Sequence, residues 1–302
     1  MRVLIIGCSG QVGSEIQREL LNSLAFEPYD FEILCATRKE LDLSENNTIP
    51  DFLESRSPNF IINATAYTAV DKSESEEMLA FNINNSAVGE MAKYCNRNQS
   101  KMLHISTDYV FDGNGKMPYK ESDAVGPIGV YGRSKLAGEN TIREVLDQHI
   151  ILRTSWVFGV NGTNFVKTML ELSRLKNELS VVADQFGGPT SARAIAQAIA
   201  RIIIYLAKNE EANHWGTYHF SGYPFVSWFE FAKEVFDRAI SIGLIDNQPI
   251  VKPIGSLEYP SPAARPKNSR LDCSKLKNIF GIEPDDWKGS LSLMLDELKW
   301  ER

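Results

Sequence analysis

A tyrosine and a lysine lie four positions apart in the segment YGRSK, residues 131–135, just after a loop that contains glycine and proline. In a helix, Tyr131 and Lys135 would share one face, one turn apart. A lysine ammonium beside a phenol favours the phenolate and so lowers the pKa of the tyrosine. A phenol tuned in this way can act as an acid or a base near neutral pH. The alternative is an exposed helix start with a chance Tyr/Lys pair.

A second group of chemistry-bearing side chains is the segment STDY, residues 106–109, at the end of a strand expected over 101–107. Ligands of doubly wound sheets bind beyond the carboxyl ends of the strands. A hydroxyl here, such as that of Thr107, would bond a substrate carbonyl oxygen that Tyr131 protonates as hydride reaches the carbon. Lys135 would lower the pKa of the tyrosine and bind the nicotinamide ribose. The alternative is a strand end with capping hydroxyls.

The segment GCSGQVG, residues 7–13, follows a short apolar run, RVLII, and precedes a helical pattern. Its glycines have separate uses: Gly7 for a tight turn, Gly10 for backbone approach to a pyrophosphate and Gly13 for helix-to-strand packing. The free amides at the helix start would hold phosphates without a basic side chain. The spacing predicts a dinucleotide site; the alternative is an ordinary glycine-rich turn.

The end of the second expected strand, CATRKELDLS, indicates which cofactor is bound. An acidic residue at the tip would bind the ribose 2′-hydroxyl of NAD. Here Thr37 and Arg38 occupy the tip and Glu40 follows. Arg38 would accept a 2′-phosphate, which favours NADPH with NADH also accepted; its alternative role is a solvated surface charge. Asp42 and Leu43 would contact the adenine.

Composition excludes several classes of protein. The chain has 302 residues and a net charge of −7 without a long basic run, which argues against nucleic acid as a partner. Four scattered cysteines show no zinc spacing and fit a reducing compartment. The N-terminal apolar run is too short for a signal peptide, and no stretch is long enough to span a membrane. We therefore expect a cytoplasmic protein that binds neither membrane nor metal.

Strand and helix patterns alternate over the first half of the chain, which predicts an α/β fold with a Rossmann-type doubly wound parallel sheet. We expect strands at 2–6, 31–37, 59–65, 101–107 and 149–159, with helices at 14–24, 49–58, 75–98 and 134–146 between them. After about residue 160 the pattern becomes irregular. Residues 1–160 are expected to form the NAD(P)-binding domain, to which some later segments return, and residues 161–302 mainly a smaller substrate-binding lobe. Residues 252–271, rich in proline, are expected to form an extended ordered loop.

Ordered sequence blocks along nearly the whole chain resemble the dTDP-4-dehydrorhamnose reductase family of extended short-chain dehydrogenase/reductases. This resemblance implies hydride transfer from NAD(P)H to C4 of a dTDP-4-keto sugar, giving dTDP-L-rhamnose. The matching blocks are GCSGQVG, NATAYTAVDKSESE, STDYVFDG, PIGVYGRSKLAGE, RTSWVFG, NFVKTML, DQFGGPT and ARPKNSRLD.

Carried over by position, Thr107, Tyr131 and Lys135 resemble the catalytic triad of that family, with Tyr131 as proton donor. The resemblance also assigns binding roles to other positions. Those for the cofactor are Gly10, Gln11 and Val12 at the pyrophosphate, Asp42 and Leu43 at the adenine, and Ala64, Thr65 and Ala66 beside the cofactor; those for the sugar are Thr107, Asp108 and Trp156. Arg265 is our expectation for a diphosphate contact, and a loop-stabilising salt bridge is its alternative.

One position departs from the family pattern. Some of these reductases bind Mg²⁺ at a dimer interface through three glutamates. Glu15 and Glu297 match two of them, but Arg193 occupies the third position. A cation there would repel the metal and could bridge the two carboxylates, so no interfacial Mg²⁺ is expected and a homodimer cannot be inferred.

Three other functions stay open on the sequence. A related 4,6-dehydratase would need an acid and a base after the strand-end threonine, whereas Tyr109 follows Asp108 here. Another sugar-nucleotide 4-ketoreductase or an epimerase is not excluded, and tightly retained cofactor would indicate the epimerase. The third is a non-catalytic regulatory subunit like the β subunit of methionine adenosyltransferase. The four histidines lack ligand or triad spacing and are assigned structural roles; they are His104, His149, His214 and His219.

Overall fold

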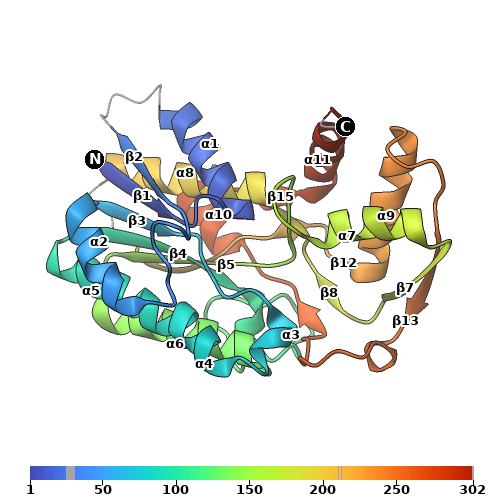
Figure 1. Ribbon diagram of the computed structural model, residues 1–302, viewed down its shortest axis with the longest axis horizontal. Coiled ribbons are helices and arrows are strands. Elements are labelled where there is room, and N and C mark those ends of the chain that lie inside the picture. Colours follow the sequence, from blue (N-terminus) through green and yellow to red (C-terminus); the bar gives the residue numbers. More distant parts are fainter. Residues whose placement is uncertain (25–30, 210, 212, 301–302) are drawn as a thin grey trace.

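A computed structural model describes residues 1–24, 31–209, 211 and 213–300, and its centre is a six-stranded parallel sheet (Figure 1). The strand order is β10-β5-β4-β3-β1-β2, and every neighbouring pair runs parallel. The expected doubly wound parallel fold is confirmed. The strands are β1 Arg2–Ile6, β2 Glu32–Ala36, β3 Phe60–Asn63, β4 Lys101–Thr107, β5 His149–Thr154 and β10 Gly216–His219.

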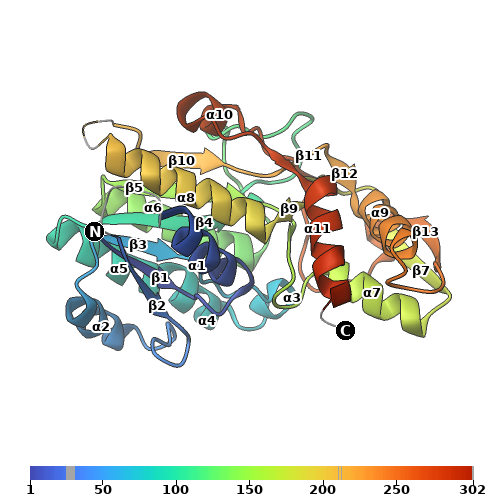
Figure 2. The ribbon, with the colours of Figure 1, turned by 90° about the horizontal axis from the view of Figure 1, so that it is seen from above.

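Helices cover both faces of this sheet, which explains why its strands are apolar on both sides. In β1, Val3 and Ile5 pack in one apolar cluster with α1, α8 and α10, whereas Leu4 and Ile6 pack in another with α2, α5 and α6. Figure 1 shows α1 and α8 above the sheet and α5 and α6 below it, and Figure 2 shows the same layers from above. These helices are α1 Gln11–Leu24, α2 Ile49–Arg56, α5 Ala87–Arg97, α6 Val130–Val145, α8 Ala192–Lys208 and α10 Ser274–Phe280.

Two expected elements differ in detail from what the structure shows. The long helix expected over 75–98 consists of α4 Glu77–Phe81, a π-helical turn Asn82–Ser86 (η2) and α5. The strand expected over 149–159 is interrupted, because Trp156 adopts a left-handed backbone with φ of 48° between β5 and the short β6 Val157–Phe158. Extended strand geometry requires a negative φ, so the pairing of β5 stops before Trp156.

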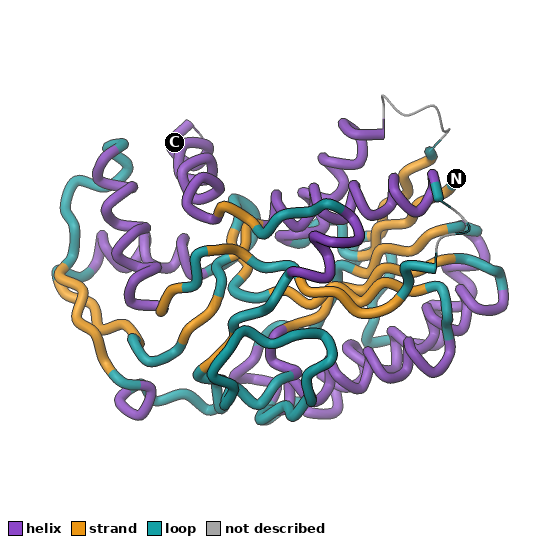
Figure 3. The backbone as a smooth tube through the Cα atoms, turned by 180° about the vertical axis from the view of Figure 1, so that it is seen from behind, coloured by secondary structure: helices purple, strands orange, loops and turns teal. Residues whose placement is uncertain are grey.

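Several elements from the second half of the chain pack around a separate apolar cluster beyond the sheet's carboxyl edge. Figure 3 shows the β7/β13 pair on the opposite side of the molecule from the main sheet. The larger elements here are α7 Phe165–Leu175, β7 Glu178–Val182, α9 Trp228–Ser241, β13 Ile250–Ile254 and α11 Trp287–Trp300. Short pieces complete the chain: η1 Asn46–Thr48, α3 Val70–Ser73, η3 Asp108–Val110, β8 Phe186–Gly187, β9 Thr190–Ser191, β11 Gly222–Tyr223, β12 Val226–Ser227, η4 Ser256–Glu258, β14 Asn268–Ser269 and β15 Asp285–Asp286.

Segments from the second half of the chain return to the main sheet. Strand β10 pairs with β5, and α8 packs beside α1 in the same apolar cluster. The division at residue 160 stays a prediction. Among the described residues, no helix has both the length and the apolar character needed to cross a bilayer.

Candidate active site

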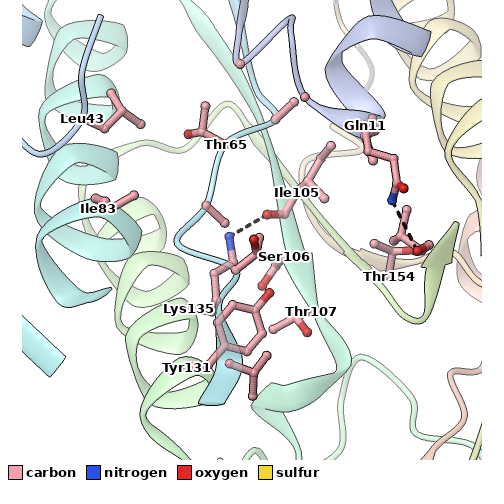
Figure 4. A pocket seen from close by; sticks show the side chains of 18 of the residues that line it. Gln11, Leu43, Thr65, Ile83, Ile105, Ser106, Thr107, Tyr131, Lys135 and Thr154 are labelled. Atoms are coloured by element: carbon pink, nitrogen blue, oxygen red, sulfur yellow. Dashed lines mark hydrogen bonds between the residues drawn. The ribbon is translucent and has the colours of Figure 1, made fainter. Parts of the chain in front are cut away.

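A pocket of about 660 Å³ opens at the carboxyl ends of β1, β3, β4 and β5 (Figure 4). The direction of the chain crossovers reverses between β1 and β3, and such a switch point is where open α/β sheets bind ligands. Most of the site residues expected from the sequence line this pocket. They are Gly7, Gly10, Gln11, Val12, Arg38, Asp42, Leu43, Ala64, Thr65, Ala66, Thr107, Asp108, Tyr131, Lys135 and Trp156. Gly13 and Arg265 lie outside the lining.

The glycine loop has the geometry that its spacing predicts. Gly7 has a φ of +87°, and a Cβ there would lie 2.5 Å from Cγ2 of Thr65. A Cβ on Gly13 would lie 2.0 Å from the carbonyl oxygen of Gly7, so Gly13 permits close packing of α1 against the turn and does not face a ligand. Helix α1 begins at Gln11, which places its first free amides at the edge of the pocket.

Gln11 connects this loop to a distant part of the chain, a role that the sequence did not indicate. Its Nε2 donates to the carbonyl oxygen of Val157 at 3.3 Å, and its Oε1 accepts from Nδ2 of Asn164 at 2.7 Å. Asn164 also caps α7 by accepting from the amide of Lys167. The glycine loop is therefore braced against the segment that carries Trp156.

The end of β2 presents a cation to the pocket. Arg38 is largely exposed, and its Nε lies 3.3 Å from Oδ2 of Asp42. The other oxygen of Asp42 accepts from the amide and hydroxyl of Ser44, and these bonds lower the pKa of Asp42. Glu40 lies outside the lining, and its carboxylate accepts from the amide and hydroxyl of Thr37. Arg38 is therefore an exposed cation at this end of the pocket, in an ion pair with Asp42 that an anionic ligand could replace.

Tyr131 and Lys135 lie one turn apart on α6, beside Thr107 at the end of β4 (Figure 4). Burial raises the pKa of Tyr131 to about 12, and a hydrogen bond with Thr107 opposes this rise. The pKa of Tyr131 is thus raised, not lowered as expected for a tyrosine beside Lys135. Nζ of Lys135 donates to the carbonyl oxygen of Ile105 at 2.7 Å and lies 2.9 Å from Nε2 of His104. Burial lowers the pKa of Lys135 to about 7.

Two buried oxygens in the lining lack a hydrogen-bond partner among the described residues. Oδ1 of Asp108 accepts from the hydroxyl of Thr107 at 3.0 Å, whereas Oδ2 has no hydrogen bond of good geometry. Burial raises the pKa of this carboxyl to about 6, and the hydroxyls of Ser269 and Thr107 oppose this rise. The hydroxyl of Thr154 is the second, at the end of β5 directly opposite Thr107. Buried polar atoms are normally bonded, so both oxygens are available to an ordered water or to a polar ligand. Thr154 was not expected from the sequence, because the strand was expected to continue to residue 159 and therefore placed Thr154 in its middle.

Ser106 is not available to a ligand in the same way as Thr107. Its hydroxyl donates to Oε1 of Glu139 at 2.6 Å, and Glu139 is held in a buried ion pair by Arg153. These bonds commit Ser106 to the packing of β4 against α6. Of the two strand-end hydroxyls, Thr107 is therefore the one presented to a substrate.

Of the two remaining expected ligand contacts, Trp156 lines the pocket and Arg265 does not. Trp156 lines the pocket, and its ring stacks on Trp228 of α9 with centroids 3.5 Å apart. Arg265 instead donates to Oδ2 of Asp71 at 3.1 Å, and its buried Nε has no partner in the described structure. Asp71 also accepts from the hydroxyl of Ser261. This is the salt bridge that was the alternative for Arg265.

Arg193 lies between the carboxylates of Glu15 and Glu297, as expected from the sequence. Its Nη2 lies 2.9 Å from Oε2 of Glu297, and its Nε lies 3.9 Å from Oε2 of Glu15. Arg18 contacts the same two carboxylates. Within the described ranges, no three or more His, Cys, Asp or Glu side chains are grouped to bind a metal. The absence of interfacial Mg²⁺ stays a prediction.

Comparison with known protein families identifies the family to which this chain belongs. The model of the family described as "RmlD substrate binding domain" matches residues 1–300. The chain belongs to this family. It is 42% identical over 290 residues to a dTDP-4-dehydrorhamnose reductase from Aggregatibacter actinomycetemcomitans, covering 96% of this chain and 97% of the relative. The resemblance inferred from the sequence blocks is confirmed.

Solved structures of family members agree in fold. A dTDP-4-dehydrorhamnose reductase from Clostridium acetobutylicum superimposes with a TM-score of 0.87 at 36% identity, covering 99% of this chain and 100% of that one. A second reductase of this name, from Bacillus anthracis, was solved in complex with NADP; its TM-score is 0.84 at 35% identity, with 98% of this chain and 99% of that one covered.

Proposed function

We propose that this protein reduces the C4 keto group of dTDP-4-dehydro-L-rhamnose to give dTDP-L-rhamnose, with NADPH as hydride donor and NADH also accepted. The observation that carries the proposal is that Thr107, Tyr131 and Lys135 meet in the pocket that the glycine loop lines. Family members of nearly the same length bear the name of this activity, and one was solved with NADP. Two lines of support therefore agree: the chain belongs to the family, and its pocket contains Tyr131 as an acid for the reaction.

The residues present fit a dinucleotide. The turn at Gly7 has no room for a side chain, and α1 begins beside it, which suits a pyrophosphate held by backbone amides. Arg38 suits a 2′-phosphate, and Asp42 and Leu43 lie beside it for the adenine. Ala64, Thr65 and Ala66 follow β3 at the switch point, between the two ends of such a ligand. When bound, the nicotinamide supplies the hydride.

The chain's own groups supply the proton and hold the sugar. A pKa of about 12 keeps Tyr131 protonated at neutral pH, so the phenol can donate to the C4 oxygen as negative charge develops there. The hydroxyl of Thr107 holds that oxygen. The free oxygen of Asp108 accepts from a sugar hydroxyl, and the flat face of Trp156 covers the apolar side of the deoxyhexose.

The same proposal also covers the roles of the two lobes, the role of Arg265 and the cellular location of the protein. Residues 1–160, with β10 and α8, form the cofactor domain, and residues 161–302 mainly form the substrate lobe. Arg265 binds the diphosphate on release from Asp71, and its unpartnered Nε supports this role. We also propose that the protein acts in the cytoplasm, since its four cysteines are unpaired.

The test is oxidation of NADPH and NADH with dTDP-4-dehydro-L-rhamnose, with wild type compared with Tyr131→Phe. We expect the variant to lose about 10²- to 10⁴-fold in kcat while binding NADPH normally. Tyr94→Phe, which changes a buried tyrosine of α5 outside the pocket, is the matched control and should keep full activity. Folded wild type that binds NADPH but oxidises neither cofactor would overturn the substrate assignment.

A further inference from the structure

The segment 157–164 lies against the first turn of α1. A Cβ on Gly159 would lie 3.5 Å from Cγ of Gln11, so the segment approaches this side chain closely. Nδ2 of Asn161 donates to the hydroxyl of Ser14 at 3.0 Å, although 147 positions separate the two residues in the sequence. The segment is therefore in direct contact with the helix that begins at the glycine loop.

The hydrogen bonds of Asn164 fix the orientation of its side-chain amide. Oδ1 of Asn164 accepts from the backbone N–H of Lys167 at 3.2 Å, and an N–H can only donate. Nδ2 must therefore be the group that faces Gln11, where it donates to Oε1 at 2.7 Å. The same Nδ2 donates to the carbonyl oxygen of Gly159 at 2.7 Å. One buried amide thus holds both the start of α7 and the loop before it.

The orientation of Asn164 in turn fixes the amide of Gln11. Because Oε1 of Gln11 accepts from Asn164, its Nε2 donates to the carbonyl oxygen of Val157 at 3.3 Å (Figure 4). Val157 follows Trp156, whose own carbonyl oxygen accepts from the N–H of Thr190 at 3.2 Å. Gln11 therefore holds the backbone directly after the left-handed residue that presents its indole to the pocket.

The backbone of Gln11 lies on the cofactor side of the pocket. Gln11 is the first residue of α1, and its N–H is one of the free amides that suit a pyrophosphate. A ligand bonded to these amides restrains the backbone of Gln11 and, through it, the side chain. Gln11 thus has its backbone beside one proposed ligand and its side chain on the segment that presents Trp156 to the other.

Side chains hold the loop that connects β6 to α7, residues 159–164. Asn164 binds one of its carbonyl groups, and Nζ of Lys167 donates to another, that of Val160, at 2.9 Å. Residues 161–163 are exposed. Exposed loops held by few contacts open locally at a low free-energy cost. A ligand that restrains Gln11 therefore makes opening of this loop less frequent.

We propose that Gln11 and Asn164 are positioning residues that couple binding of the cofactor to binding of the sugar nucleotide. The identity of the two ligands rests on the proposed function. A cofactor pyrophosphate on the glycine loop restrains Gln11, which closes the segment 157–164 and holds Trp156 in place for the sugar. By linkage, a sugar nucleotide that binds against Trp156 tightens cofactor binding by the same factor.

Asn164→Asp separates this coupling from a purely structural role of the same residue. An aspartate keeps an oxygen for the N–H of Lys167, so the cap of α7 is retained. Its second oxygen faces two acceptors, Oε1 of Gln11 and the carbonyl oxygen of Gly159. If the amide of Gln11 reverses in order to donate, its oxygen then faces the carbonyl oxygen of Val157. The contact between the glycine loop and the segment is weakened in either case.

The first test is amide hydrogen exchange with and without NADP⁺, which needs no sugar nucleotide. Residues 158–162 lie outside the pocket lining, so a bound ligand does not cover their amides directly. In wild type, saturating NADP⁺ should slow exchange there about five- to tenfold. In Asn164→Asp, NADP⁺ should still protect residues 7–13 but should slow exchange at 158–162 by about twofold or less. Gln11→Met removes the other side of the contact and should give the same result, which keeps the test decisive if Asn164→Asp does not fold.

Asn161→Asp is the matched control for the added charge. It introduces the same carboxylate three positions away, on the exposed side of the segment, and loses the bond to Ser14 instead of the bond to Gln11. NADP⁺ should slow exchange at 158–162 in this control as much as in wild type. Equal slowing in wild type and Asn164→Asp, or a wild-type segment that exchanges at one rate with and without NADP⁺, would overturn the proposal.

The coupling itself is measured by calorimetric titration with dTDP-L-rhamnose. Saturating NADP⁺ should lower the Kd about five- to tenfold in wild type and in Asn161→Asp, but about twofold or less in Asn164→Asp. The same factor in wild type and Asn164→Asp would contradict the role of the contact. Because hydrogen exchange requires only that NADP⁺ binds, a folded protein that binds NADP⁺ but reduces no sugar would overturn the proposed function and still give a result for this coupling.

Discussion

The indole rings of Trp156 and Trp228 stack with centroids 3.5 Å apart and planes 10° from parallel. Trp156 lines the pocket in a left-handed backbone conformation, and Trp228 starts α9 some seventy residues later, where Phe165 also packs on it. A Cβ on Gly187 would lie 2.5 Å from the Trp156 ring, so the ring is fixed on that side too. The proposed sugar platform is therefore held by the C-terminal part of the chain.

Replacing Trp228 should weaken binding of the sugar nucleotide more than it changes the chemistry. Stacked aromatic pairs contribute about 0.5–1.5 kcal/mol beyond burial, so Trp228→Leu should raise KM for the sugar about two- to tenfold. The Kd for NADPH should stay unchanged. Steady-state kinetics and NADPH fluorescence check both values, with Phe229→Leu, at the next position of α9, as control. A fall in kcat at constant KM would contradict the platform role.

The pKa of Asp108 predicts an unusual pH dependence of stability. Burial raises this pKa from 3.8 to about 6, so the folded protein binds this proton more tightly than the unfolded chain. Its ionisation therefore costs stability as pH rises from about 4 to about 6, and the cost persists above that range. Asp108→Asn should gain on the order of 3 kcal/mol in unfolding free energy, relative to wild type, between about pH 4 and about pH 7.

Urea unfolding at several pH values measures this difference. Asp112→Asn is the control, since the bond from Tyr119, the largest cause, lowers the pKa of Asp112. A lowered pKa contributes stability that is lost as pH falls, so the variant and wild type should diverge in the opposite direction. An Asp108→Asn difference that does not vary with pH would show that the carboxyl is not desolvated.

The parts of the site that depend on local sequence spacing were predictable, whereas the parts that depend on contacts between distant residues were not. The spacing of Tyr131 and Lys135 placed both on one helix face, and the glycine spacing placed Gly7 at a left-handed turn. The sequence could not show that Lys135 turns to His104, because that contact depends on how α6 lies across β4.

Other features depend on distant pairs that no local pattern records. Arg265 meets Asp71 across 194 positions, and Gln11 meets Asn164 across 153. The break at Trp156 was not expected, because the sequence around it has the pattern of one continuous strand. In the structure, Trp156 has a left-handed backbone and its ring stacks on the distant Trp228. The doubly wound parallel sheet, by contrast, followed from the alternation of strand and helix patterns that the local sequence does contain.

Arg38 should set the preference between the two cofactors. Because a hydrogen bond to a charged group contributes about 1.5–3 kcal/mol and Arg38 is exposed, Arg38→Ala should raise the Kd for NADPH about tenfold. The Kd for NADH, which lacks the 2′-phosphate, should change little. Lys39→Ala, at an exposed neighbour outside the pocket, controls for loss of charge alone. Equal losses for both cofactors would exclude a 2′-phosphate contact.

Arg193 lies between two carboxylates in the structure. Its guanidinium lies 2.9 Å from Glu297 and 3.9 Å from Glu15, and burial raises the pKa of Glu15 despite this contact. Removing the cation leaves the buried Glu15 with Arg18 as its remaining basic partner in the described structure. The two guanidiniums of Arg18 and Arg193 therefore balance the charge of the two carboxylates in this cluster.

Arg193→Glu should therefore make the stability of the protein depend on added Mg²⁺. We expect the variant to lose about 2 kcal/mol of unfolding free energy in EDTA, because three carboxylates then face each other. Mg²⁺ should restore part of that loss, whereas wild type should unfold at the same temperature with Mg²⁺ or EDTA. Arg193→Gln is the matched control, since it removes the cation without adding a ligand and should not respond to Mg²⁺. A wild-type protein stabilised by Mg²⁺ at this cluster would show that Arg193 does not exclude the metal.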